Sequence, residues 1–320
     1  MITTALTDMF RLQYPIVLAP MGSVSGGHLA ATVSNAGGLG LVGGGYGDAT
    51  WLRKELSRAK EETRRPWGVG LITWSINQSV LELALSYQPD AFMLSFGDPR
   101  PYARMIKSAG CKLICQVQDV HQARMACEAG ADLIVAEGTE AGGHGGTRTT
   151  LTLVPTVVDA VAPVPVIAAG GIGDGRGLAA ALMLGAHGVL LGTRFYASLE
   201  ALGTDEAKQR IVASSGNDTA RTRTFDIVRG YQWPAQYTGR AIRNRFMEHW
   251  DNRESELAAA LETERIAYRA AVSEGNYDTA VVWAGEVMDM VKNIESATVL
   301  VAQISREAET QLRTVSKLVR

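Results

Sequence analysis

One histidine lies in a glycine-rich loop and has the residue type suited to proton transfer. His144 belongs to the segment 137–146, which reads Glu-Gly-Thr-Glu-Ala-Gly-Gly-His-Gly-Gly and follows the apolar run Leu133–Ala136. Its immediate neighbours carry no bulky side chain, so the imidazole can face a bound ligand. Imidazole titrates near neutral pH, which predicts a general base here. The structural alternative is a loop histidine bonded to backbone, and Glu137 and Glu140 could orient the ring, bind ligand hydroxyls or stay solvated.

Two apolar runs that end in glycine predict a phosphate site. Each run is short and continuous, as in a strand buried on both faces of a parallel sheet. The residues that follow the two runs are Gly170, Gly171, Gly173, Gly192 and Thr193. Glycine lets the backbone approach a phosphate closely, and the loops after the last two strands of an α/β barrel commonly bind phosphate. The alternative is that these glycines only form tight turns.

The elements that position these residues alternate between strand and helix. Eight apolar runs recur at a spacing of about 25 residues, as βα units require. We therefore expect an α/β fold of the TIM (β/α)8 barrel type over residues 1–198, with its site where the carboxyl ends of the strands converge. The residues placed there are Ala19, Pro20, Met21, Gly70, Gln116, Glu137, Gly142, Gly143, His144, Ala169, Gly170, Gly171, Gly192 and Thr193.

The chain after residue 198 changes in composition. Residues 199–280 predict a mainly helical cap over the barrel mouth, with one strongly helical stretch at Glu254–Glu274. Residues 281–320 predict two amphipathic helices, Val281–Met290 and Ile294–Leu318, that pack back on the barrel. Four cap arginines could meet an anionic substrate or form a solvated basic face, and these are Arg221, Arg223, Arg240 and Arg243.

The composition disfavours several classes of partner. The net charge is −2 and no basic tract is interleaved with aromatic residues, so nucleic acid is not expected to bind. No histidine or cysteine cluster has metal-ligand spacing, so no metal site is expected.

No apolar run approaches the roughly 20 residues that span a membrane, and the N-terminus lacks a signal-peptide pattern. Three cysteines without a CxxC pair predict reduced thiols, and together these features predict a cytoplasmic enzyme.

Four segments resemble the nitronate monooxygenases, formerly called 2-nitropropane dioxygenases, and the related flavin-dependent enoyl-ACP reductases. These segments are Ile16–Met21, Glu137–Gly145, Val166–Gly175 and Leu191–Phe195. The resemblance covers roughly residues 10–195, and Trp283–Gly285 also resembles a family segment near the flavin. The motifs are specific for the superfamily and less specific for the activity within it.

The resemblance implies FMN in the barrel mouth. It implies a phosphate cradle at Gly170, Gly171, Gly192 and Thr193, and a segment beside the flavin ring at Ala19–Met21. Gln116 matches a polar flavin contact, whereas Gly70 departs from an asparagine that many members have, for which Thr73 or Asn77 could substitute. The remaining cofactor residues expected from the loops are Glu137, Gly142, Gly143 and Ala169.

The function implied by the resemblance is oxidation of small alkyl nitronates with O2. His144 matches the histidine that removes a proton from a neutral nitroalkane, and the redox chemistry belongs to the flavin. Two alternatives stay open at this point. One is an NAD(P)H-dependent FMN reductase acting on an enoyl thioester or a quinone, and the other is a flavin-free barrel lyase or isomerase that binds a phosphorylated substrate. The sequence predicts no particular oligomeric state.

Overall fold

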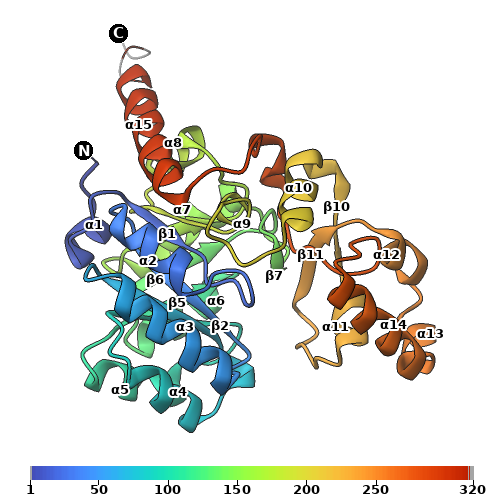
Figure 1. Ribbon diagram of the computed structural model, residues 1–320. Coiled ribbons are helices and arrows are strands. Elements are labelled where there is room, and N and C mark those ends of the chain that lie inside the picture. The colour runs from blue at the N-terminus through green and yellow to red at the C-terminus, as the bar shows by residue number, and fades with distance from the viewer. Residues whose placement is uncertain (1, 316, 318–320) are drawn as a thin grey trace.

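The predicted barrel is confirmed by the computed structural model, which describes residues 2–315 and 317 (Figure 1). Its parallel strands are β1 (Ile16–Leu18), β2 (Gly40–Gly45), β3 (Trp67–Ile72), β4 (Ala91–Ser95), β5 (Lys112–Val117), β6 (Leu133–Glu137), β8 (Val166–Ala169) and β9 (Val189–Leu191). They follow the order β1-β9-β8-β6-β5-β4-β3-β2. A parallel bridge between Val17 and Leu39 joins β1 to the chain that enters β2, which closes the barrel.

A helix follows each of the strands β1 to β6 and β8, as the alternating pattern predicted. These helices are α2 (Gly27–Asn35), α3 (Ala49–Glu62), α4 (Gln78–Leu85), α5 (Arg100–Ser108), α6 (Val120–Glu128), α7 (Thr150–Val161) and α8 (Gly175–Met183). Several begin at a side chain that accepts a hydrogen bond from the first-turn backbone, among them Asp48, Asn77 and Asp119. Asp174 caps α8 in the same way, as expected from its position after the glycines.

The inside of the barrel is filled by apolar side chains, and only one end stays open. Val17, Met93 and Ile167 are fully buried within it. At the N-terminal end of the strands the short helix α1 (Ala5–Phe10) inserts Leu6 and Phe10, which are also buried. A ligand can therefore enter only from the C-terminal ends of the strands, where barrel enzymes carry their sites.

The cap region contains a sheet that the sequence did not predict. The helices of the cap region are α10 (Asp205–Ala213), α11 (Thr224–Arg229), α12 (Arg245–Trp250), α13 (Glu254–Ala259) and α14 (Leu261–Glu274). Between them β10 (Thr219–Thr222) and β11 (Thr238–Ile242) form an antiparallel sheet with β7 (Gly143–Gly145) from the barrel loop. The region also has its own apolar core around Phe225, and the predicted helix 254–274 breaks at Ala260.

The predicted helix Val281–Met290 is wrong. Residues 281–285 have no regular structure, and a 3₁₀ turn covers only Glu286–Met290. The reason is that this segment bonds to distant strands and loops: the Ile242 N–H donates to the Val282 carbonyl, and the Glu286 N–H donates to the Glu140 carbonyl. Both groups are thereby engaged outside any helix that the segment could form.

The last helix returns to the barrel. α15 (Ala297–Val315) lies against α8, and Gly175 of α8 permits the close approach, since a Cβ there would lie 2.2 Å from the Cβ of Glu307 (Figure 1). The predicted helix 294–318 is thus confirmed over 297–315 but begins three residues later than predicted, because Glu295 forms a parallel bridge with Ser198, and Leu318 lies outside the described residues. Among the described helices, none is long and apolar enough to cross a membrane.

Candidate functional site

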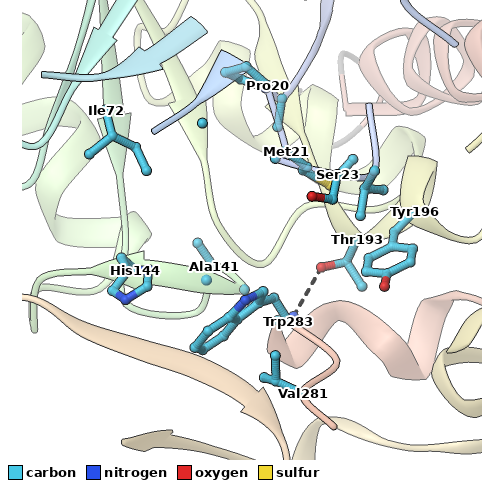
Figure 2. A pocket seen from close by; sticks show the side chains of 18 of the residues that line it. Pro20, Met21, Ser23, Ile72, Ala141, His144, Thr193, Tyr196, Val281 and Trp283 are labelled. Atoms are coloured by element: carbon cyan, nitrogen blue, oxygen red, sulfur yellow. Dashed lines mark hydrogen bonds between the residues drawn. The ribbon is translucent and has the colours of Figure 1, made fainter. Parts of the chain in front are cut away.

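A cavity of about 740 Å³ opens at the C-terminal ends of the barrel strands. All the residues placed at the mouth from sequence line it: Ala19, Pro20, Met21, Gly70, Gln116, Glu137, Gly142, Gly143, His144, Ala169, Gly170, Gly171, Gly192 and Thr193. Figure 2 shows the labelled side chains around an open space, with His144 and Trp283 across from Pro20 and Met21. Its volume lies within the range of cofactor and substrate sites.

The two glycine loops present free backbone donors to this cavity. Gly170 and Gly171 have φ of +100° and +70°, which disfavours any other residue, and a Cβ on Gly170 would lie 2.8 Å from the Gly138 carbonyl oxygen. Within the described residues the N–H groups of Gly171 and Gly192 have no hydrogen-bond acceptor. Thr193 Oγ1 accepts from the Gly285 N–H at 3.0 Å, so its own hydrogen is left to donate (Figure 2). This donor set fits a phosphate group.

The wall formed by β1 and β3 explains why residue 70 is a glycine. A Cβ on Gly70 would lie 2.3 Å from Pro20 Cγ, so Pro20 occupies the space that a larger side chain would need. The proposed substitutes for an asparagine are wrong. Neither Thr73 nor Asn77 lines the cavity, and the Asn77 side chain caps α4 by accepting from the Val80 N–H at 3.1 Å.

The loop before His144 packs tightly on the segment that follows α14. A Cβ on Gly142 would lie 2.6 Å from the carbonyl carbon of Ala284, and Gly143 has φ of +75°. Trp283 and Gly285 also line the cavity, in agreement with the resemblance of this segment to one near the flavin. The glycines therefore bring two stretches that are far apart in sequence against the same wall.

The partner of His144 comes from the cap. His144 lies in β7, is buried, and its Nε2 is 2.8 and 2.9 Å from the two carboxylate oxygens of Asp226 in α11. The sequence left open that Glu137 or Glu140 orients the ring, and neither does. Glu140 instead accepts from the N–H and hydroxyl of Thr150. An ionised carboxylate at Nε2 favours the tautomer with the proton there, which leaves the lone pair on Nδ1.

Aromatic side chains fix the plane of the imidazole. The Trp233 ring stacks on His144 with centroids 3.5 Å apart and planes 3° apart, and Phe96 and Trp283 lie at 6.3 and 5.1 Å. Trp233 Nε1–H donates to the Tyr46 hydroxyl at 2.9 Å. Burial lowers the pKa of His144, and Asp226 opposes that effect. The ring is therefore neutral at neutral pH and suited to accept a proton.

A buried carboxyl, that of Glu137, lines the cavity near Gln116. Glu137 Oε2 accepts from Gln116 Nε2 at 2.8 Å and from Gln118 Nε2 at 2.9 Å. Burial raises the pKa of Glu137 to about 7, against the opposing effects of Gln118, Arg221 and Gln116. The sequence did not single out Gln118, which lies two residues beyond Gln116 on the same face of β5 and its extension.

The arginines considered from sequence do not line the cavity. Arg221 donates to the carbonyl oxygens of Thr139 and Thr238, and Arg240 pairs with Glu286 at 2.9 Å. Arg223 and Arg243 are exposed. The arginines that do line it are Arg229 of α11 and Arg265 and Arg269 of α14. None of these three has a carboxylate within ion-pair distance in the part of the chain that the structure describes.

The sequence signal for the cap residues was weak. Asp226 is 82 residues from His144, and no local pattern connects a cap helix to a barrel loop at that separation.

No group of three potential metal ligands occurs in residues 2–315 and 317. Cys111, Cys115 and Cys127 are free, as expected, and the first two are buried.

The chain is similar to proteins of known name over most of its length. A family model described as nitronate monooxygenase matches residues 3–79 and 71–307. The chain is 32% identical to a nitronate monooxygenase of Neurospora crassa over 347 aligned positions, which cover 94% of the chain and 90% of that protein. It is 36% identical over 233 positions to (3aS,4S,5R,7aS)-5-hydroxy-7a-methyl-1-oxo-octahydro-1H-indene-4-carboxyl-CoA dehydrogenase of Rhodococcus jostii, covering 70% of the chain and 63% of that protein. The solved structure of FabK from Thermotoga maritima is similar with a TM-score of 0.89, 33% identity and full coverage of both chains.

Proposed function

Because the chain belongs to the nitronate monooxygenase family, a family of flavin-dependent oxidoreductases, we propose that it oxidises alkyl nitronates with O2 using FMN. We further propose that it oxidises neutral nitroalkanes, with His144 as general base. The observation that carries this proposal is a buried imidazole, bonded to a carboxylate, in the same cavity as two glycine loops whose N–H groups have no acceptor among the described residues. As a member of this family the chain is an oxidoreductase, which leaves no support for the flavin-free lyase. Its cytoplasmic location stays a prediction.

The residues present fit FMN. Gly170, Gly171, Gly192 and Thr193 would hold the phosphate through backbone and hydroxyl donors. The wall of Ala19–Met21 would lie beside the ring, with Gln116 and Glu137 at its polar groups. Other residues proposed to contact the cofactor are Gly70, Gly142, Gly143 and Ala169. When bound, the flavin would accept two electrons from the substrate and pass them to O2.

His144 would supply the proton transfer. A carbon next to a nitro group is acidic enough for imidazole to deprotonate, and Nδ1 carries the lone pair when Asp226 holds the proton at Nε2. Trp233 prevents the ring from rotating, and Phe96 and Trp283 limit the access of water to it. A preformed nitronate has already lost this proton, so it should not depend on the base.

The test is an anaerobic titration of the flavin-loaded protein. Addition of propionate 3-nitronate should bleach the visible absorption of the flavin, whereas NADPH should leave it unchanged. Bleaching by NADPH but not by the nitronate would reject the proposal and favour the reductase. A purified protein that is colourless and cannot be loaded with FMN would reject both.

A second candidate is the NAD(P)H-dependent reduction of an enoyl thioester. The observation that favours it is a group of three arginines along the cavity, Arg229, Arg265 and Arg269, which have no carboxylate within ion-pair distance among the described residues. Phosphate-bearing ligands such as NADPH and coenzyme A thioesters are bound by such cations. The dehydrogenase from Rhodococcus is named for a carboxyl-CoA substrate. Replacing Arg265 and Arg269 with Gln should weaken NADPH or acyl-CoA binding by about tenfold or more if this candidate is correct. Arg243→Gln is the matched control, since it is exposed and outside the cavity.

A further inference from the structure

Glu137 is a buried acid to which the proposed proton transfer assigns no role. It is the last residue of β6, it lines the cavity, and 7% of its surface is exposed. Both of its donors, Gln116 Nε2 and Gln118 Nε2, bind the same oxygen, Oε2. Within the described residues Oε1 has no hydrogen-bond donor. Oε2 is therefore held by two hydrogen bonds, whereas Oε1 is available to a ligand in the cavity.

Among the described residues, no cation forms an ion pair with this carboxylate. Two neutral amides support the charge without cancelling it, and a buried carboxylate without a cation is costly. The cation whose charge acts on Glu137 is Arg221 on β10, and its guanidinium donates to the carbonyl oxygens of Thr139 and Thr238. The other titratable group that interacts with Glu137 is Tyr237 before β11, and Arg240, Glu286 and Glu140 act on Arg221 beside it.

A charge change in the cavity would therefore decide whether Glu137 carries a proton. A flavin that accepts two electrons and one proton gains a negative charge. In a site of low dielectric, a second negative charge nearby favours protonation of a carboxylate. The pKa of Glu137, raised by burial to about 7, is already in the range where a neighbouring charge can change its protonation state at neutral pH.

We infer that Glu137 takes up one proton from water when the bound flavin is reduced and returns it when the flavin is reoxidised. The electrons come from the substrate and leave to O2, and the proton taken up by the carboxylate keeps the net charge of the carboxyl group and the ring the same in both states. This inference rests on the FMN part of the proposed function and is independent of which substrate supplies the electrons. Glu137 would thus set the redox potential of the cofactor and its pH dependence.

The experiment is a potentiometric titration of the flavin-loaded enzyme between pH 5.5 and 8.5. One proton per two electrons corresponds to about 30 mV per pH unit. Above pH 7, the redox potential of the wild-type enzyme should fall with pH more steeply than that of Glu137→Gln. The difference in slope should be about 30 mV per pH unit. Glu140→Gln is the matched control, since Glu140 lines the same cavity but its carboxylate is bonded to Thr150. It should keep the wild-type slope.

A second variant tests the inference independently, in case Glu137→Gln does not retain the flavin. Gln118 does not line the cavity, so Gln118→Ala removes one donor to Oε2 without touching the cofactor. Because that donor favours the charged carboxylate, its loss should move the change of slope to higher pH. Equal slopes in wild type and Glu137→Gln, or an unmoved change of slope in Gln118→Ala, would overturn the inference. Failure to load FMN at all would overturn the proposed cofactor, and this inference with it.

Discussion

The barrel mouth and the cap contribute to the same cavity in different ways. The barrel contributes backbone: Gly170 and Gly171 follow β8 with positive φ, and among the described residues the N–H groups of Gly171 and of Gly192 after β9 have no acceptor. The cap contributes side chains that act on one barrel residue, since Asp226 binds His144 and Trp233 stacks on it. On the proposed function, the barrel half would hold the cofactor, whereas the cap half would position the base.

The two regions also differ in how they are stabilised. The barrel strands and their helices share one extended core, whereas Phe225, Phe246, Trp250 and Tyr268 form a separate core in the cap. The sheet β10-β11-β7 is the exception, because it pairs two cap strands with the loop that carries His144. The position of His144 therefore depends on both regions, and the following variants test each side.

The largest effect is expected for the base itself. His144→Ala should lower kcat/KM for a neutral nitroalkane by roughly 10² to 10⁴, the range for loss of a general base. Oxidation of a preformed nitronate should change far less, because no proton has to be removed. Steady-state kinetics with nitroethane and its nitronate measure both, and the flavin content serves as the control. Equal losses on the two substrates would assign His144 to binding and not to proton transfer.

A smaller loss is expected for its cap partner. Asp226→Asn should lower kcat/KM for the nitroalkane by roughly tenfold to a hundredfold, less than removal of the base. Asp226 raises the pKa of His144, so its removal lowers that pKa further below its usual value. Since only neutral imidazole accepts a proton, activity is lost as pH falls through the pKa of His144. The acid limb of the pH profile should therefore move to lower pH.

The control for Asp226→Asn is Asp251→Asn, which changes a cap acid that, unlike Asp226, has no bond to His144 among the described residues. It should leave both kcat/KM and the pH profile unchanged. An acid limb at the same pH in wild type and Asp226→Asn would show that the carboxylate does not act through His144. The cap would then contribute only shape to the site.

These differences explain what could be predicted from the sequence. The barrel was predictable because each βα unit repeats a local pattern, and the ends of parallel strands must converge whatever the loops contain. The glycine loops and His144 followed from that geometry. Asp226, Trp233 and the strands β10 and β11 did not. Asp226 lies 82 residues from its partner His144, Trp233 and β11 also contact that distant loop, and β10 pairs with β11, so local periodicity gives no signal for them.

The wrong predictions have the same physical origin. Val281–Met290 has helical composition, but its backbone bonds to β11 and to the loop after β6 instead. Arg221 and Arg240 were candidates for the cavity, yet their guanidinium groups bond to backbone carbonyls of the loop that precedes His144. In both cases a distant partner determined the outcome.

On the barrel side, Gly170→Ala tests the cradle. A φ of +100° costs an alanine about 1 to 2 kcal/mol, and its Cβ would lie 2.8 Å from the Gly138 carbonyl oxygen. FMN affinity should fall by about tenfold, measured by fluorescence titration of the apoprotein, while the pH profile of the loaded enzyme stays unchanged. Gly110→Ala is the matched control, since its φ is +79° but nothing lies within 4 Å of a Cβ and it is remote from the cavity. Unaltered FMN affinity in Gly170→Ala would argue against a phosphate at this loop.

The smallest effect is expected where the two regions touch beside the base. Trp233 belongs to the cap and Tyr46 follows β2, and the bond from Trp233 Nε1–H to the Tyr46 hydroxyl joins them at 2.9 Å. Trp233→Phe keeps an aromatic ring over His144 but removes this bond, whose net contribution is about 1 kcal/mol. We expect kcat/KM for the nitroalkane to fall between about twofold and fivefold, with the nitronate unaffected. Trp233→Leu, which also removes the stacked ring, should cost more than Trp233→Phe. If the two variants are equal, the stacking has no part in holding the imidazole, and Asp226 alone orients it.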